Sequence, residues 1–178
     1  MMTNKILVVY KSETGYTKKY AEWLSQELSC DIKENKRLAL EDLTPYNTII
    51  YGGGLYAIGI NGLSLIKKNL DSLKDKKLIL FAVGATPPRE KDIQKVWESN
   101  LTEDQRAIIH TFYCRGGFDY SKLSTRNKLL MNMMKKKLQG MKNPDEDALD
   151  MLEAFDKPVD FTDKENIIPI VELINKSS

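Results

Sequence analysis

The chain of 178 residues is poor in the residue types that build disulfide frameworks and metal centres. It has two cysteines, Cys30 and Cys114, and one histidine, His110. Two cysteines cannot form a multi-bridge framework, and no other potential ligand lies near them with metal-binding spacing. We therefore expect two free thiols and no bound metal. His110 lies in an apolar stretch, which favours a packed strand residue over a catalytic base.

The chain also lacks a long hydrophobic run and a sizeable net charge. No apolar run approaches the roughly 18 residues of a membrane-spanning helix, and the first run, Ile6–Val9, is too short for a signal peptide. The 27 Lys and Arg residues nearly balance the 25 Asp and Glu residues, and 42% of the chain is hydrophobic. This composition excludes a disordered or fibrous protein. It fits a cytoplasmic enzyme or carrier, and a nucleic acid is not among the partners we expect.

Short apolar runs alternate with longer amphipathic segments along nearly the whole chain. Strands are predicted over Ile6–Tyr10, Cys30–Asn35, Thr48–Tyr51, Leu78–Val83 and Ile108–Cys114. Helices are predicted over Tyr16–Leu28, Leu63–Leu73, Asp92–Ser99 and Lys164–Asn175, the last interrupted in pattern by Pro169. Such alternation is typical of βαβ units, so it predicts a three-layer α/β sandwich around a parallel sheet. The short, charged second strand is expected at an edge, and the third is expected to stop at Gly52–Gly54.

The turn between the first strand and the first helix, Ser12–Thr17, is the most informative stretch. Its backbone N–H groups, its hydroxyls and the start of the following helix would all favour an anion such as a phosphate. The turn lacks the lysine of the G-x-x-x-x-G-K-[ST] nucleotide loop, and it also lacks G-x-G-x-x-G, so ATP or GTP hydrolysis and a dinucleotide are disfavoured. Taken alone, the same hydroxyls fit a simple helix cap equally well.

Two further loops belong to the same edge of the predicted sheet. The third strand leads into Gly52–Gly59, and the fourth leads into Gly84–Pro88. In a doubly wound sheet, a ligand binds beyond the carboxyl ends of the strands, at the switch point between the first and third strands. The sequence therefore predicts one ligand site that is built by three loops.

The first loop matches the pattern [ST]-x-T-G-x-T through Ser12, Thr14, Gly15 and Thr17. In this the chain resembles flavodoxin-like proteins, whose first loop binds the phosphate of FMN and whose other two loops enclose the isoalloxazine ring. The resemblance implies FMN as cofactor and one domain over residues 1–178, with a five-stranded parallel sheet in the order 2-1-3-4-5. The cofactor-binding residues that it implies are Ser12, Glu13, Thr14, Gly15, Tyr16, Thr17, Gly53, Gly54, Leu55, Tyr56, Ala57, Ile58, Gly59, Gly84, Ala85, Thr86 and Pro87.

Two side chains have individual roles in this interpretation. Tyr56 is the best candidate to stack on the flavin ring, because an aromatic face gains energy there without requiring polar partners. The alternative for Tyr56 is an exposed surface residue. Arg115 would position a substrate carboxylate or the pyrimidine edge of the flavin, since guanidinium pairs well with carboxylates, or else it is a surface loop residue. No nucleophile–base pair is evident in the sequence, so we nominate no catalytic residue.

Beyond the three loops, the chain is similar to a branch of flavodoxin-like proteins that contains menaquinone-dependent protoporphyrinogen IX dehydrogenase. The likeness rests on Arg115–Leu123, on the basic segment that follows it, and on Val159–Asp163. It implies an FMN-dependent oxidoreductase that passes electrons between a small substrate, a protoporphyrinogen or a quinone, and an acceptor.

Two other functions stay open at this point. One is an FMN electron shuttle between redox proteins; such shuttles are typically strongly acidic, so the near-neutral charge here favours the enzyme. The other is an FMN-independent binding or signalling domain. A response regulator would need paired aspartates after the first strand, where this chain has Lys11 and Ser12.

The balanced total charge conceals two segregated segments. Residues 120–143 include seven basic residues and no acidic one, whereas residues 145–165 include nine acidic and two basic residues. In the basic segment an extra helix is predicted, with one face formed by Leu123, Leu130, Met134, Leu138 and Met141. Three roles are open for this helix. It would pack against the core and expose its charged face to solvent, or it would form a lid or a partner surface at the site. In the third, residues 121–142 would contact an anionic bilayer.

Overall fold

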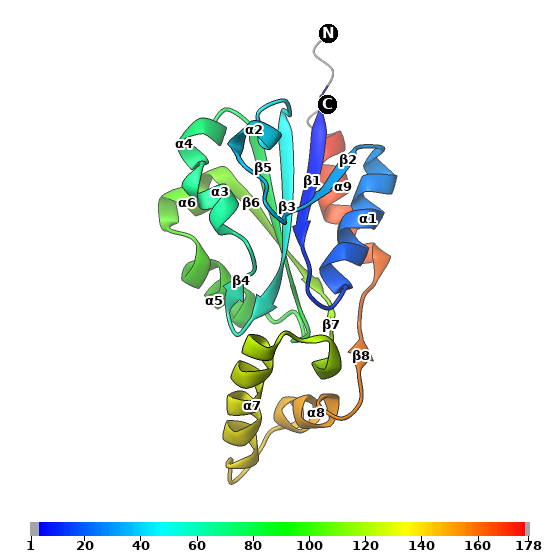
Figure 1. Ribbon diagram of the computed structural model, residues 1–178, viewed down its shortest axis with the longest axis vertical. Helices are drawn as coiled ribbons and strands as arrows, with labels where there is room; N and C mark the ends of the chain where they lie inside the picture. Colours follow the sequence, from blue (N-terminus) through cyan, green and yellow to red (C-terminus); the bar gives the residue numbers. More distant parts are fainter. Residues whose placement is uncertain (1–3, 177–178) are drawn as a thin grey trace.

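The computed structural model describes residues 4–176 and has a parallel sheet at its centre (Figure 1). The strands of this sheet are β1 (Ile6–Lys11), β2 (Asp31–Glu34), β3 (Thr48–Tyr56), β5 (Lys77–Gly84) and β6 (Ile109–Arg115). They lie in the order β2-β1-β3-β5-β6, and every neighbouring pair is parallel. Counted along the chain, these five strands follow the predicted order 2-1-3-4-5, with the second strand at an edge. The predicted α/β fold is confirmed.

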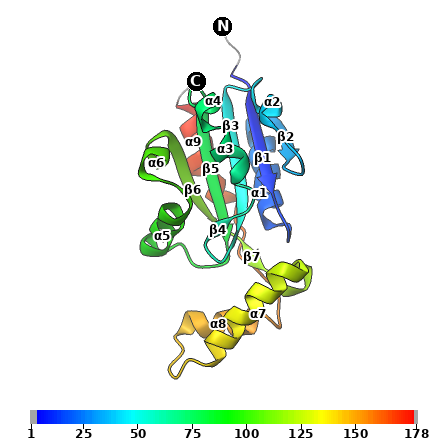
Figure 2. The same cartoon turned by 60° about the vertical axis from the view of Figure 1, so that its left-hand side comes forward.

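Helices cover both faces of the sheet and complete the three layers (Figures 1 and 2). On one face, α1 (Tyr16–Leu28) and α9 (Ile168–Asn175) pack through an apolar cluster that includes Tyr20, Leu24 and Ile170. The other face carries α2 (Leu40–Leu43), α3 (Ser64–Lys68), α4 (Leu70–Leu73) and α5 (Glu90–Asn100), and α6 (Glu103–Ile108) leads into β6. The middle residues of β1, β3 and β5 are almost inaccessible to solvent, as expected for strands covered on both faces.

The observed helices match the predicted helices to different degrees. The first, α1, begins and ends at the predicted residues. The predicted helix Leu63–Leu73 is divided into α3 and α4 at Asn69, whose φ of −110° and ψ of 9° leave the helical region. The predicted C-terminal helix starts as a 3-10 helix over Lys164–Ile167 and continues as α9, with Pro169 in its first turn. Proline is tolerated there because the first N–H groups of a helix have no intrahelical partner.

The expected end of the third strand at Gly52–Gly54 is wrong, because β3 runs through all three glycines to Tyr56. A Cβ on Gly52 would overlap the ring of Phe81 on β5, and a Cβ on Gly53 would overlap the side chain of Ile60. These glycines therefore allow close packing within the sheet rather than ending the strand. Beyond them, β3 forms an antiparallel hairpin with a short strand that was not predicted, β4 (Gly59–Ile60).

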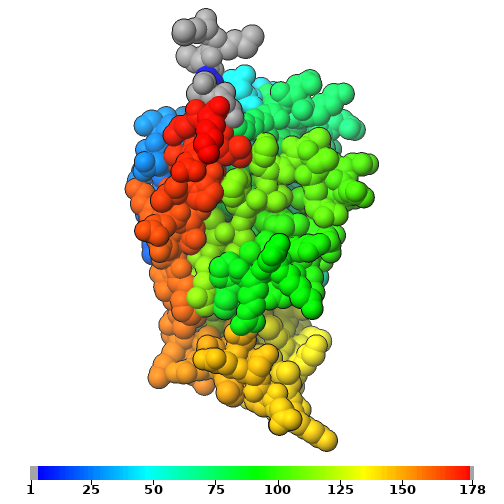
Figure 3. All heavy atoms as spheres, turned by 180° about the vertical axis from the view of Figure 1, so that it is seen from behind, coloured from blue at the N-terminus to red at the C-terminus, as the bar shows by residue number. Residues whose placement is uncertain are grey.

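A helical insert, residues 117–160, follows β6 and forms a lobe beyond the carboxyl end of the sheet (Figures 1 and 3). It consists of β7 (Gly117–Phe118), a 3-10 helix (Tyr120–Lys122), α7 (Thr125–Gln139), α8 (Glu146–Ala154) and β8 (Val159–Asp160). Strands β7 and β8 pair with each other, so the insert begins and ends at adjacent points. Its own small core contains Phe118, Leu123, Met131, Ala154 and Phe155. Helix α7 is the helix predicted in the basic segment, whereas α8 was not predicted.

Three smaller expectations can be compared directly with the structure. Both cysteines are free thiols, as expected, and Cys114 is fully buried. His110 lies in β6 but is exposed rather than packed, since β6 is at an edge of the sheet. Within residues 4–176, no helix is long and apolar enough to cross a membrane. The predicted domain limits, residues 1 and 178, lie outside the described residues.

Candidate functional site

The loop between β1 and α1 is folded around Ser12 and Gly15. The Ser12 hydroxyl accepts a hydrogen bond from the Gly15 backbone N–H at 3.0 Å. Gly15 has a φ of 97°, a left-handed conformation that side chains rarely adopt, although a Cβ there would meet no other atom within 4 Å. No side chain caps α1, which begins at Tyr16. The simple helix-cap interpretation of the loop hydroxyls is therefore wrong, and the first N–H groups of α1 have no capping side chain.

The three predicted loops meet around a small cavity of about 130 Å³ at the carboxyl edge of the sheet. Ten of the predicted residues line it: Thr14, Tyr16, Thr17, Gly54, Leu55, Tyr56, Ala57, Gly84, Ala85 and Thr86. The remaining wall comes from Val83, from the beginning of the insert, and from Met131, Met134 and Met151 of its two helices. The insert therefore lies over the space that the three loops enclose.

Several predicted residues do not line this cavity. Ser12 and Gly15 shape the first loop from outside, and Gly53 is packed inside β3 against Ile60. Ile58 and Gly59 lie in the β3–β4 hairpin, where Ile58 is exposed. The assignment of all these residues to cofactor binding stays a prediction.

Glu13 contacts the insert instead of the cavity. Its carboxylate accepts hydrogen bonds from the Ser124 backbone N–H and, at 2.5 Å, from the Asn127 side-chain amide. Ser124 is the N-cap of α7, so the carboxylate also lies at the positive end of that helix. Burial by itself would raise the pKa of Glu13, but the hydrogen bonds from Ser124 and Asn127 lower it overall. Glu13 therefore joins the predicted phosphate loop to the insert.

Tyr56, the predicted stacking residue, packs beneath the insert. Its ring contacts the small core of the insert, and its hydroxyl lies beside Glu13. Burial and then the nearby Glu13 carboxylate raise the pKa of the Tyr56 hydroxyl. Because the ring lines the cavity with most of its surface covered, it differs from the exposed surface tyrosine that was the alternative.

A second, larger cavity of about 670 Å³ adjoins the small one. The two cavities share five lining residues: Ala85, Thr86, Phe118, Met134 and Met151. The larger cavity extends between α7, α8 and the loop after β5, which includes the predicted residue Pro87. Leu138 and Met141 add apolar surface from the basic segment. Part of the predicted apolar face of α7 therefore lines a cavity at the site.

Arg115 lies at the wall of this larger cavity. Its Nε donates a hydrogen bond to the Ala85 carbonyl oxygen at 3.2 Å, and its guanidinium carbon lies 3.7 Å from the ring centroid of Phe161. These two contacts fix the orientation of the guanidinium group. Phe161 was missing from the predicted site, since an isolated aromatic residue in an acidic stretch carries no recognisable signal.

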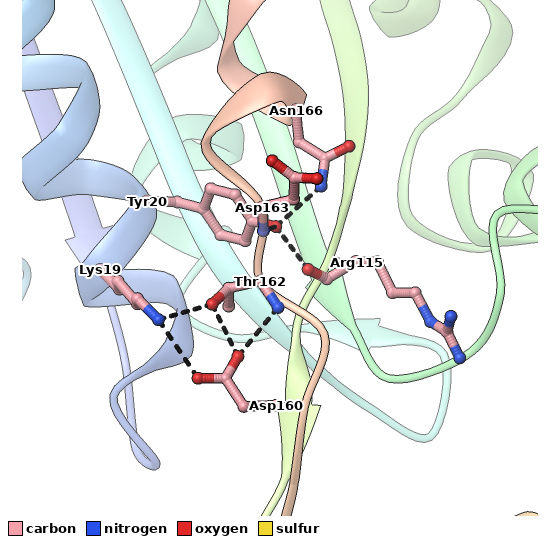
Figure 4. Close-up of polar contacts among 7 residues, drawn as sticks. All are labelled: Lys19, Tyr20, Arg115, Asp160, Thr162, Asp163 and Asn166. Atoms are coloured by element: carbon pink, nitrogen blue, oxygen red, sulfur yellow. Dashed lines mark hydrogen bonds and ion pairs between the residues drawn. The ribbon is translucent and has the colours of Figure 1, made fainter.

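A polar network fastens the end of the insert to α1 (Figure 4). The Tyr20 hydroxyl donates to the Arg115 carbonyl oxygen at 2.5 Å, and it accepts from the Asp163 backbone N–H and the Asn166 side-chain amide. The preceding residue of α1, Lys19, contacts the Asp160 carboxylate at 3.2 Å. This network was not predicted from the sequence. It holds the strand that enters the insert and the segment that leaves it against one helix.

Comparison with known families agrees with this geometry. The family described as a flavodoxin domain matches residues 7–145, which include the three loops and most of the insert. The chain belongs to the flavodoxin domain family. One protein similar to this chain is the uncharacterized protein MJ0298 of Methanocaldococcus jannaschii, which is 28% identical over 119 residues. That alignment covers 65% of this chain and 78% of MJ0298.

Solved flavoproteins also resemble this chain. A putative flavoprotein from Bacteroides eggerthii is 17% identical with a TM-score of 0.46, and the match covers 75% of this chain and 98% of that one. A flavoprotein from Lactobacillus acidophilus, solved in complex with FMN, is 18% identical with a TM-score of 0.41, covering 64% and 93% of the two chains. Flavodoxin 2 from Bacillus cereus is 17% identical with a TM-score of 0.41, covering 85% and 99%.

Proposed function

We propose that this protein binds FMN, with the phosphate in the loop between β1 and α1. The observation that carries the proposal is the uncapped start of α1 behind a loop with the pattern [ST]-x-T-G-x-T, in a chain of the flavodoxin domain family. Free N–H groups at a helix start attract phosphate. Thr14 and Thr17 line the cavity beside them and would add hydroxyl donors.

The flavin ring would lie where the insert now meets the three loops. A cavity of about 130 Å³ is small for such a ligand, since small-molecule sites usually measure about 300–1,000 Å³. The ring would therefore displace methionines of the insert or extend toward the larger cavity. Methionine suits such a position because its unbranched side chain adapts to irregular apolar shapes.

We further propose that the larger cavity receives a small redox substrate, which makes the protein an FMN-dependent oxidoreductase. The cavity adjoins the proposed flavin position through five shared residues. Bound FMN would supply the electron transfer, while the protein orients both partners and excludes water. Arg115 would donate hydrogen bonds to a substrate oxygen from its remaining N–H groups, since only its Nε contacts Ala85.

The charge of the larger cavity favours a neutral quinone over a porphyrinogen that carries carboxylates. Its wall includes two basic residues, Arg115 and Lys157, and four acidic residues, Asp145, Asp147, Asp150 and Glu153. An anionic substrate would be repelled by the excess of acidic groups, whereas a neutral apolar ring would contact Met134, Met141 and Met151. A quinone-type substrate is therefore our first choice.

The cofactor can be tested on the purified protein. We expect visible flavin absorbance, or its appearance when FMN is added to the apoprotein, with FMN as the released species. Thr14→Ala combined with Thr17→Ala should weaken FMN binding about tenfold or more, because each lost bond to the phosphate is worth roughly 1.5–3 kcal/mol. Ser72→Ala, at an exposed residue of α4, is the matched control. A colourless protein that also refuses FMN would contradict the proposal.

The substrate can be tested separately with methyl-labelled methionine. Titration with menadione, a soluble naphthoquinone, should shift the NMR signals of Met134, Met141 and Met151 and leave that of exposed Met133 in place. Anaerobically reduced holoprotein should then be oxidised by menadione. Fast electron exchange with a redox protein, without any turnover of menadione or protoporphyrinogen, would instead identify an electron shuttle.

A further inference from the structure

Helix α7 has apolar residues on its outer side as well as on the side that faces the insert. Met131 packs into the small core of the insert and is only 9% exposed. Leu129 and Met133 are 65% and 64% exposed, among the most exposed large hydrophobic residues of the described chain. Residues four apart lie one above the other on a helix, whereas residues two apart point in nearly opposite directions. Leu129 and Met133 therefore form one patch, opposite Met131.

The acidic helix α8 lies on the inner side of α7. Lys135 of α7 has its ammonium 5.0 Å from the ring centroid of Phe155, directly after α8, and 3.8 Å from the Asp156 carboxylate. Met131 faces the same small core as Phe155. Asp156 and the end of α8 are therefore separated from the outer patch by the width of α7.

Cations surround the outer patch. Arg126, Lys136 and Lys137 are all exposed, and helical spacing places them beside Leu129 and Met133. Within residues 4–176, none of these three cations forms an ion pair with an acidic residue. Segment 120–143 contains no acidic residue at all. The outer side of α7 thus has an apolar pair with cations and no acidic residue around it.

We propose that this outer face of α7 docks onto an anionic lipid bilayer. Leu129 and Met133 would enter the interface, while the long basic side chains would reach the lipid phosphates. Anionic lipid complements a surface that has cations and no acidic group. A second copy of the same face would be repelled, because a two-fold interface would oppose these cations to one another. Docking depends on α7 alone and is expected with and without FMN.

The test is co-sedimentation of the full-length protein with vesicles. We expect binding to vesicles made of equal parts phosphatidylcholine and phosphatidylglycerol, weaker binding at high salt, and none to phosphatidylcholine alone. Leu129→Ser combined with Met133→Ser should weaken binding about tenfold or more, because the apolar part of the interaction is lost. Leu149→Ser, at a residue of α8 that is 53% exposed, should bind like the original protein.

A second pair of variants tests the charge. Lys136→Glu with Lys137→Glu should abolish binding to the anionic vesicles. Lys68→Glu with Lys74→Glu changes the net charge equally and should retain binding. These exposed residues belong to α3 and to the turn after α4, which lie on the sheet, away from the lobe that contains α7 (Figure 1). Equal loss in both charge variants, or undiminished binding of the Leu129 and Met133 variant, would overturn the proposal. Absence of binding to any vesicle would also overturn it. So would a dimer, seen by light scattering, that dissociates in the Leu129→Ser, Met133→Ser variant.

Discussion

The sheet with its flanking helices and the helical insert are held together in different ways. The sheet is buried on both faces, and its two apolar clusters extend from β1 to α9. The insert has one small cluster, which only Tyr56 and Ala85 of the site loops extend, and its polar contacts to the first loop and helix are those of Glu13 and Lys19. Polar contacts can break one at a time, whereas a shared core is lost as a unit. We therefore expect the insert to open without unfolding of the sheet.

Gly52→Ala should give the largest effect, because it acts on the shared core. The new Cβ would overlap the fully buried ring of Phe81, which has no room to move. Overpacking of this kind costs about 3 kcal/mol of unfolding free energy, measurable by urea denaturation. Gly140→Ala is the control, since its Cβ would lie at an ordinary 3.5 Å from the Lys136 carbonyl oxygen. Equal stability of the two variants would mean that β3 tolerates a side chain at residue 52.

Tyr20→Phe should come next, because this core residue also binds the segments just before and just after the insert. The ring would keep its place in the core, but the Arg115 carbonyl, the Asp163 N–H and the Asn166 amide would lose their partner. We expect a loss of about 2 kcal/mol and faster hydrogen exchange in segment 160–166. Tyr46→Phe removes one hydroxyl that donates to exposed Asp31, and it should change stability by less than about 0.5 kcal/mol.

Glu13→Ala should release the insert while sparing the sheet. The backbone N–H of Ser124 and the side chain of Asn127 would lose their acceptor at the start of α7. Amide protection in α7 should fall about tenfold, with little change in the urea midpoint of the sheet. Glu98→Ala is the control. It removes an exposed carboxylate of α5 that accepts a hydrogen bond from Gln94 of the same helix. A parallel loss of protection in β1, β3 and β5 would contradict the comparison.

Acid should have the smallest and most selective effect. Since hydrogen bonds in the folded protein lower the pKa of Glu13, its contribution is complete above the ordinary pKa of glutamate and is lost as pH falls through the lowered value. Asp160, whose pKa is also lowered by Thr162 and Lys19 against the effect of burial, should act in the same direction. Hydrogen exchange should report opening of α7 as the pH falls below the ordinary pKa of glutamate and through the lowered one. Glu13→Gln should flatten this profile.

The sheet was predictable from the sequence because its signals are local. Each buried strand is a short apolar run, each helix has its own periodicity, and the hydroxyl loop falls directly between β1 and α1. The error at Gly52–Gly54 arose because the side chains that crowd Gly52 and Gly53, Phe81 and Ile60, belong to other strands. The local pattern marks a glycine as a break, and only the packing shows what lies against it.

The insert was only partly predictable for the opposite reason. Helix α7 has a sequence pattern of its own, but its position over the site depends on Glu13, which lies 111 residues before Ser124. Glu13 was assigned to the cofactor because of its place in the loop, whereas its contacts are with α7. The outer patch of Leu129 and Met133 was likewise missed, because two apolar residues on a basic helix become visible only when the inner side is known.

The pairing of Gly117 with Asp160 and of Phe118 with Val159 places the two ends of the insert side by side. The residues between these ends can therefore be replaced or deleted without a change in the strand order of the sheet. A two-residue Asn-Gly turn in place of residues 119–158 would close the same ribbon as an ordinary hairpin. The shortened chain would retain its three loops and lose both the larger cavity and the basic outer surface.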